Sequence, residues 1–491
     1  MLTRRRWIPT AVSPILVSRA SAQVTADLVR LRPEIEPLVR LIEATPRDKA
    51  ASVLADQLRS GVSYRQFLAA LFLAGVRNIN PRPPGFALHA VFIIHAAHLL
   101  SLEAAPRDRL LPLFFAFDDF KKSQERDSKA TTGDYAMGPL PGALPPPDKA
   151  VAEFQAAMEA WDQPRAERAV AVLARTRSLP AIFEVLWPYA VRDYRNIGHK
   201  PIYAANAFRT LQTIGEEHAE PVLRSLTLSL LDYGKDRKVD GYVFEDQCFG
   251  PNQRRVAETH AQLPAAVWEL QSSRATVRAL VKLSREASVN DGCADIAARL
   301  GKGRATAADV WAAVHLSAAE MRMRAPQARV IQGIHALTSA NGLHHAYNAA
   351  ADSRTRHLIL LQAAGWMLQF RGQFDAFKDA PRAFSLVDLE PAASGADPLA
   401  LVPKDLDAAS AAVVAAAADR TARLALQREL TALTVAKANE VHYLKYQVAV
   451  RENLAMAAPE WHPQLLAAAV WYTKAREDAE SPIVRAAREL L

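Results

Sequence analysis

Four histidines stand near the start of apolar helical segments, and imidazole is the side chain best suited to both metal binding and proton transfer near neutral pH. They are His89 in LHAVFIIHAAHLL, His199 in GHKPIYAANAFRTL, His335 in GIHALTSANGLHHAYNAA and His442 in VHYLKYQVAVREN. Helical bundles build interior metal or cofactor sites from single side chains on several facing helices. We therefore expect these four imidazoles to meet in one interior site, as metal ligands or as acid and base groups.

Helix geometry limits how many histidines of one segment can join that site. At about 100° per residue, His95 and His98 share a face, whereas His89 lies about 180° from His98. A straight helix cannot aim all three at one centre. We expect His89 to face the site, and His95 and His98 to support it or to be bonded within the core.

The last segment adds a lysine to the candidate site. Lys445 follows His442 by three residues and shares its helix face. If it is half buried, its pKa would be lowered and its ammonium could hold an anion formed in a reaction. Glu440 would lie about 160° from His442 on a helix, so we do not expect it to be a co-ligand.

The elements that must position these residues are predicted to be helices. The 491 residues are 50% hydrophobic and 23% charged, which is the balance of a globular protein. Glycine is scarce, alanine runs such as AAVVAAAA at 411–418 favour helix, and Ser63-Tyr64-Arg65-Gln66 is a helix-starting capping box. No alternating strand pattern or fixed-period repeat occurs. The predicted class is all-α, an irregular array of paired helices of HEAT-like or multi-helix-bundle type.

Proline- and glycine-rich stretches divide the chain. Residues 23–379 are predicted to form the main helical domain, with a Gly/Pro loop at 127–148 and a polar insertion at 233–255. Residues 380–405 read as a surface linker, and 406–491 as C-terminal helices that pack on the main domain. We expect the loop at 127–148 to cover a site, since long structureless loops often do. Asn341-Gly342 is expected to interrupt the helix that carries His335.

The first 22 residues resemble a twin-arginine export signal. Thr3-Arg4-Arg5-Arg6-Trp7-Ile8 precedes a short apolar stretch, and Ala20-Ser21-Ala22 has the form of a cleavage site. Trp7 and Ile8 replace the Phe and Leu of the consensus. We expect export to the periplasm by this route, which carries folded proteins; without it the protein would be cytoplasmic.

Charge and apolar length limit the partners. The net charge of +8 is modest, and the basic residues are interleaved with acids in runs such as KKSQERDSK, so we expect no nucleic-acid partner. No run of 18 continuous apolar residues occurs, so we expect no integral membrane span. The expected partner is a small-molecule substrate.

Several common chemistries lack their motif. Cys248 and Cys293 form no C-x-x-C, which disfavours thiolate zinc sites, iron–sulfur clusters and covalent haem. H-E-x-x-H, G-x-S-x-G, a phosphate loop and the paired E-x-x-H of di-iron bundles are all missing from the sequence. Two kinds of site are compatible with the sequence, a mononuclear metal site with histidine ligands and a haem held by histidine. The scarcity of nearby acids favours a transition metal, iron first, over calcium or magnesium.

Three of the segments resemble motifs of the questin oxidase-like family. LHAVFIIHAAHLL is similar to its F-H-G-x-I-R-T-A-Y-A-L stretch, GIHALTSANGL to T-H-A-V-T-x-x-x-A-L, and EVHYLKYQVAVREN to x-x-H-x-x-K-x-x-x-A. They occur in the same order and cover about 40 residues.

The resemblance implies an all-helical enzyme that opens an aromatic polyketide ring by a Baeyer–Villiger-like oxidation with NADPH. The resemblance supports His89, His335, His442 and Lys445 as site residues. The assignment of His199 to the site depends only on the pattern of one histidine per helix. Ile93-Ile94 stand where the family has Arg-Thr, which removes a charged contact to substrate.

The sequence therefore predicts an oxidoreductase of questin oxidase-like type with an interior His-rich site for an aromatic or other apolar small molecule. The alternative is a non-catalytic α-solenoid that binds a partner on its concave face and uses its histidines for packing.

Overall fold

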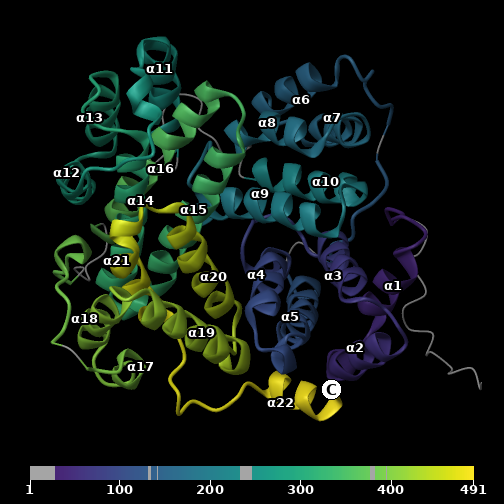
Figure 1. Cartoon of the computed structure of the whole chain (residues 1–491). Helices are drawn as coiled ribbons and strands as arrows, with labels where there is room; N and C mark the ends of the chain where they lie inside the picture. Colours follow the sequence, from purple (N-terminus) through teal and green to yellow (C-terminus); the bar gives the residue numbers. More distant parts are fainter. Residues whose placement is uncertain (1–27, 131–133, 141, 233–245, 376–381, 394) are drawn as a thin grey trace, which may run out of the picture.

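The computed structural model describes residues 28–130, 134–140, 142–232, 246–375, 382–393 and 395–491. Within these residues the chain folds into helices numbered up to α22 and no strand, so the predicted all-α class is confirmed. The helices form an irregular packed array (Figure 1). The segment predicted to be an export signal lies outside the described residues.

The first five helices form one group beside the C-terminal helix (Figure 1). A capping box starts α3, because the Ser63 side chain accepts from the Gln66 backbone and the Gln66 side chain returns to the backbone of Ser63. A 3-10 turn, η2 (Phe86–Leu88), leads into α4. The helices here are α1 (Glu36–Ala44), α2 (Ala50–Arg59), α3 (Tyr64–Asn78), α4 (His89–Glu103) and α5 (Leu111–Ser128).

The middle of the chain packs as two further groups. The first is α6 (Ala150–Glu159), α7 (Gln163–Thr176), α8 (Leu179–Ala190), α9 (Arg195–Ile214) and α10 (Ala219–Leu230). The second is α11 (Phe249–Thr259), α12 (Arg274–Glu286), α13 (Val289–Gly301), α14 (Ala307–Arg324), α15 (Val330–Ala349) and α16 (Ser353–Asp375). The predicted polar insertion ends earlier than expected, because α11 already begins at Phe249 with that ring buried.

The C-terminal helices close the molecule. They are α17 (Pro398–Leu401), α18 (Leu406–Ala417), α19 (Arg420–Lys437), α20 (Val441–Met456), α21 (His462–Ala467) and α22 (Pro482–Leu490). The segment read as a linker holds α17 and buries Leu386 and Val387. The last helix, α22, returns to α2 and α5 beside the chain terminus (Figure 1).

Four helices from distant parts of the sequence form a closed ring of contacts at the centre. Helix α4 packs on α9, α9 on α15, α15 on α20, and α20 back on α4. Each of the four carries one of the predicted site histidines. Helix α15 runs without a break through Asn341-Gly342, contrary to expectation. Gly342 serves close packing instead, since a Cβ there would lie 2.8 Å from the carbonyl oxygen of Pro201 on α9.

A left-handed turn at the start of α9 aims His199 inward. Asn196, Ile197 and Gly198 all have positive φ, at 52°, 50° and 85°. Such a conformation is strained for a β-branched residue and persists only where the surroundings enforce it. Gly198 has no room for a side chain, because a Cβ would lie 2.7 Å from that of Ser339 on α15. The turn therefore depends on tight packing between α9 and α15.

A buried ion pair spans this turn. Lys200 Nζ lies 2.7 Å from Asp193 Oδ2, and both side chains are fully buried. The other oxygen of Asp193 accepts the backbone N–H of Arg195. Asp193 thus binds residues on both sides of the left-handed turn.

Helix α4 and its 3-10 entry, Phe86–Glu103, form a segment long and apolar enough to cross a membrane by composition. Most of it is buried inside the protein, at 61% of the window, including His89 and His95. We treat it as a core helix of the central ring, where its apolar faces contact α3, α5, α9 and α20.

Buried histidines outside the ring predict a pH-dependent stability. Burial lowers the pKa of His357 to about 4, and the side chain is fully buried. The folded protein keeps His357 neutral. Its contribution to stability is therefore present above about 6.5, the pKa of a histidine in the unfolded chain, and is lost as the pH falls from there toward 4. Urea titrations at pH 7 and pH 5 should show the free energy of unfolding falling, with His357 contributing about 2 kcal/mol of the loss.

The variant His357→Leu isolates that contribution. We expect it to lose about 2 kcal/mol less than the wild type between pH 7 and pH 5. An equal loss in both proteins would mean that His357 is protonated in the folded state.

Candidate metal centre

The four predicted histidines converge on one point inside the central ring. The Nε2 atom of His199 lies 3.1 Å from Nε2 of His89 and 2.9 Å from Nε2 of His335. The ring centroid of His442 lies 4.9 Å from that of His89 and 5.4 Å from that of His335. Four segments that together span more than 350 positions of the chain thus deliver one imidazole each.

Backbone carbonyls fix the orientation of three of these rings. The Nδ1 atoms of His89, His199 and His335 lie within hydrogen-bonding distance of the carbonyl oxygens of Phe86, Asn196 and Ile331 respectively. A carbonyl only accepts, so each Nδ1 must carry the hydrogen and each neutral Nε2 must carry a lone pair.

The lone pairs therefore point at one another. Two nitrogens about 3 Å apart that both present lone pairs repel unless a cation or a proton lies between them. Burial lowers the pKa of His89, His199 and His335 well below the usual histidine value, and the charge of Lys445 lowers it further. Protonation is thus disfavoured, and a metal cation suits this arrangement better than a proton.

The fourth ring is held by a carboxylate. Glu440 Oε2 lies 2.6 Å from Nδ1 of His442, and Glu440 Oε1 accepts from Tyr472 at 2.7 Å. Burial by itself would raise the pKa of Glu440, but the bonds to His442 and Tyr472 keep it below its usual value. Nε2 of His442 is buried and has no hydrogen-bond partner among the described residues. A carboxylate behind a ligating imidazole is a common way to orient and strengthen the ligand.

Glu440 has no predicted role at the site, because its spacing from His442 would set the two side chains about 160° apart on one helix. The structure makes it the N-cap of α20, where its side chain also accepts the backbone N–H of His442. The 160° angle therefore does not apply. Glu440 lies on the Nδ1 side of the His442 ring and bonds both that nitrogen and the backbone N–H of His442.

Lys445 completes the cluster. Its Nζ lies 3.0 Å from Nε2 of His335, and burial lowers its pKa to about 7. Glu440 opposes that shift by its charge. The ammonium group can donate to the lone pair of His335, and the neutral amine can act as a further nitrogen donor.

The spacing of the nitrogens suits one ion. Two imidazole nitrogens bound to the same metal at about 2.0–2.1 Å lie about 3 Å apart. The ligand atoms of His89, His335 and His442 all lie within 4.8 Å of one another. His199 adds a fourth nitrogen at the measured distances from His89 and His335. The cluster thus has the number and type of ligands for a mononuclear transition-metal site.

A pocket of about 530 Å³ opens onto this cluster. Its walls include the four imidazole rings, and Lys445 is not among the residues that line it. Apolar side chains line much of it, namely Pro84, Phe86, Ile197, Ile331 and Val441, and helix α5 adds Asp119, Lys122, Ser123 and Arg126. This volume accommodates a small organic molecule, and the mixed lining is typical of ligand sites.

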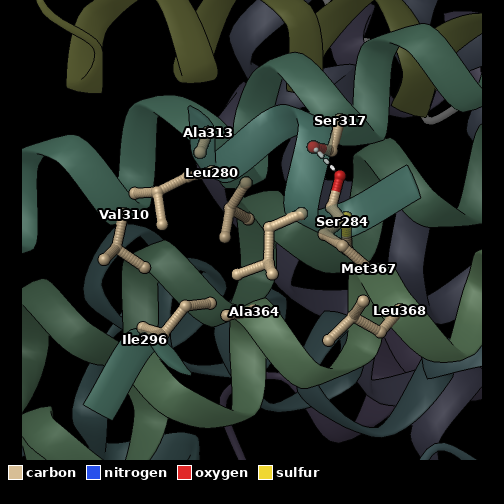
Figure 2. Close-up of a pocket in the computed structure, with 11 residues that line it drawn as sticks. Leu280, Ser284, Ile296, Val310, Ala313, Ser317, Ala364, Met367 and Leu368 are labelled. Atoms are coloured by element: carbon tan, nitrogen blue, oxygen red, sulfur yellow. Dashed lines mark hydrogen bonds between the residues drawn. The ribbon is translucent and has the colours of Figure 1, made fainter. Parts of the chain in front are cut away.

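A second cavity, between α12, α13, α14 and α16, offers no comparable chemistry. Figure 2 shows aliphatic side chains around it and a single hydrogen bond, between Ser284 and Ser317 at 2.8 Å. Its volume is about 20 Å³, room for about one water molecule. It is a packing gap in the core.

The remaining histidines of the same helices do not join the centre. His95 bonds Glu452 at 2.9 Å, and Glu452 also pairs with Arg209. His98 contacts the Tyr64 hydroxyl at 3.3 Å, and His345 accepts from Arg209 at 3.2 Å. His95, Glu452, Arg209 and His345 form a second polar layer between α4, α9, α15 and α20, whereas the contact of His98 with Tyr64 joins α4 to α3.

Sequence reasoning missed Asp119, Glu440 and the carbonyl of Phe86. Phe86 has a positive φ of 44° and follows Gly85, whose missing side chain leaves room for the His199 ring. The signal available in the sequence was Pro83-Pro84-Gly85, which marks a tight turn just before His89. The Gly/Pro loop predicted at 127–148 does not line the pocket in the part that is described, residues 127–130, 134–140 and 142–148.

No family model, curated protein or solved structure matches this chain. Fold and geometry therefore define only the class: an all-helical protein whose central ring of helices encloses a polyhistidine cluster beside a pocket.

The carboxylate behind His442 predicts a measurable change in metal binding. We expect Glu440→Gln to weaken the affinity for a transition metal by about 10- to 100-fold, because an amide fixes His442 less firmly and donates less electron density. Calorimetric titration with zinc measures this. The matched control is Glu429→Gln on α19, which alters an ion pair at the surface with Arg476. It should bind zinc with the affinity of the wild type.

Proposed function

We propose that this protein is a metal-dependent oxidoreductase that acts on an aromatic or other apolar small molecule. The observation that carries the proposal is the convergence of four imidazole lone pairs, with one buried lysine, on the wall of an apolar pocket. His95 illustrates the packing alternative, because its Nε2 bonds Glu452 at 2.9 Å while its Nδ1 is buried without a hydrogen-bond partner among the described residues. In the cluster the Nε2 lone pairs of His89, His199 and His335 are instead directed at one another, an arrangement that a bound cation would stabilise.

The chain's own residues would bind the ion and shape its surroundings. His89, His199, His335 and His442 would hold it, and a bound transition metal would supply redox or Lewis-acid chemistry at the pocket wall. The apolar lining would exclude water and take up the body of the substrate. Nε2 of His335 cannot hold a proton and a metal ion at once, so Lys445 would face a bound ion as the neutral amine, whose nitrogen is a further donor.

A bare ion fits the cluster better than a haem does. In five of the six pairs that His89, His199, His335 and His442 can form, the ring centroids lie only 4.4–6.1 Å apart. A porphyrin plane could not pass between them. Imidazole ligands suit iron, copper, zinc and nickel, and the proposed redox role favours iron.

The resemblance to the questin oxidase-like family supports the same reaction class and would add NADPH as electron donor. The described residues contain no strand and hence no βαβ nucleotide-binding unit. We propose no step through a nicotinamide. Export by the twin-arginine-like segment at 1–22 would be consistent with a protein that folds around its metal before transport.

The metal content of the full chain tests this function. Protein purified without a histidine tag should contain about one transition-metal ion per chain by mass spectrometry, or should take one up from iron(II), copper(II) or zinc(II). Failure to bind any of the three stoichiometrically would contradict the proposed function.

A further inference from the structure

Helix α5 presents an unusual carboxylate to the pocket. Asp119, Lys122, Ser123 and Arg126 follow one another at helical spacing, and all four line the pocket that also exposes the histidine cluster. Asp119 is 9% exposed, and its Oδ2 is buried with no hydrogen-bond partner among the described residues.

Two other aspartates of the same helix show what a structural carboxylate looks like here. Asp118 forms ion pairs with Arg47 and Lys122 at 2.8 Å each. Asp127 accepts two backbone N–H groups at 3.0 Å. Asp119 has neither kind of partner, and a buried carboxylate without one destabilises the fold. A buried carboxylate without such partners in a pocket is therefore a candidate for contact with a ligand.

We propose that Asp119 is the residue that accepts a proton, or a hydrogen bond, from an O–H or N–H group of the molecule bound in this pocket. This role rests on the proposed function. In a proton transfer the substrate X–H bond breaks, its electron pair stays on the substrate, and the proton forms the O–H bond of the Asp119 carboxylic acid. The substrate anion then lies in a pocket that also holds Lys122 and Arg126. The proton returns to the product or to solvent.

The surroundings allow both protonation states near neutral pH. Burial raises the pKa of Asp119 to about 7; Asp118 and Glu440 raise it as well, whereas Lys122 and Arg126 oppose the shift. Among the other ionisable groups of the pocket, His89, His199, His335 and His442 face it from α4, α9, α15 and α20. A base of this pKa is well matched to proton transfer near neutral pH.

Indole and 1-methylindole test the hydrogen bond directly, because only indole has an N–H and neither ionises between pH 6 and pH 8. In the wild type we expect the affinity for indole, relative to 1-methylindole, to rise by up to about tenfold from pH 6 to pH 8 as Asp119 ionises. In Asp119→Asn the ratio should not change with pH. Asp148→Asn, an exposed site, should behave as the wild type. Three outcomes would overturn the proposed role of Asp119. They are an affinity ratio that does not change with pH in the wild type, the same rise of the ratio in Asp119→Asn, and no binding of either compound.

Stability gives a second test that needs no ligand. Because folding raises the pKa of Asp119, this carboxyl group contributes to the stability of the fold at low pH. That contribution is lost as the pH rises from about 4 to about 7. Asp119→Asn should therefore unfold at a higher urea concentration than the wild type at pH 8. A lower concentration would show a structural carboxylate and contradict the role. Metal content, measured on the same samples, should be equal, so loss of the proposed metal function and loss of the Asp119 role are separate outcomes.

Discussion

Replacing His335 by alanine should abolish metal retention while leaving the helical fold intact. His335 occupies the middle of the cluster, since its Nε2 contacts both His199 Nε2 at 2.9 Å and Lys445 Nζ at 3.0 Å. Loss of this ligand removes one nitrogen and also frees the Lys445 ammonium to repel a cation. We expect metal affinity to fall by more than about 100-fold, because even the loss of a supporting residue costs about 10- to 100-fold.

Metal mass spectrometry, calorimetric titration and circular dichroism measure this together. His98→Ala is the matched control, because His98 lies on the same ring of helices but is bonded to Tyr64, away from the cluster. It should retain the metal. Equal metal content in His335→Ala and the wild type would remove His335 from the centre, whereas loss of helical signal would call for His335→Gln as the replacement.

The second large effect is on stability, through the ion pair that spans the left-handed turn. Asp193→Ala leaves the Lys200 ammonium fully buried, and the acceptors that remain among the described residues are the carbonyl oxygens of Leu230 and Asp232. Breaking a buried pair in this way costs about 3–5 kcal/mol, because the remaining charge has lost its partner. Urea unfolding should show a decrease of this size in the free energy of unfolding.

The double variant Asp193→Leu with Lys200→Met separates charge burial from shape. It should recover most of the stability, because two apolar side chains of similar volume carry no desolvation cost. Asp295→Ala, which breaks a half-exposed pair with Arg299, should cost less than about 1 kcal/mol. A loss of that small size in Asp193→Ala would show that Lys200 is neutral or solvated.

The same variant should affect the metal site. The left-handed turn at 196–198 aims His199, and Asp193 binds residues on both sides of it. We therefore expect Asp193→Ala, at a temperature where it is still folded, to bind metal more weakly than the wild type. The double variant should recover stability more fully than metal affinity, because it removes the bonds that hold the turn.

The sequence by itself determined the helical class and the candidate ligands. Scarce glycine, alanine runs and a 3.6-residue apolar period leave the backbone few alternatives to helix. One histidine at the start of each of several apolar segments singled out His89, His199, His335 and His442, because these positions repeat a local pattern. The face angle that separated His89 from His98 was also local information, since both residues lie on one straight helix.

Only the tertiary structure decided that these residues meet. Convergence depends on contacts between α4, α9, α15 and α20, which are up to several hundred residues apart and whose order of packing no local pattern encodes. The sequence placed Glu440 on a helix and expected a break at Asn341-Gly342, because propensity does not reveal which residue caps an end or which glycine admits a neighbouring backbone. Asp119 carried no signal, since one aspartate among several on a polar helix resembles a solvated residue until its burial is known. Burial and missing partners are properties of the packed chain, and they distinguish the aspartate that can react from those that only stabilise.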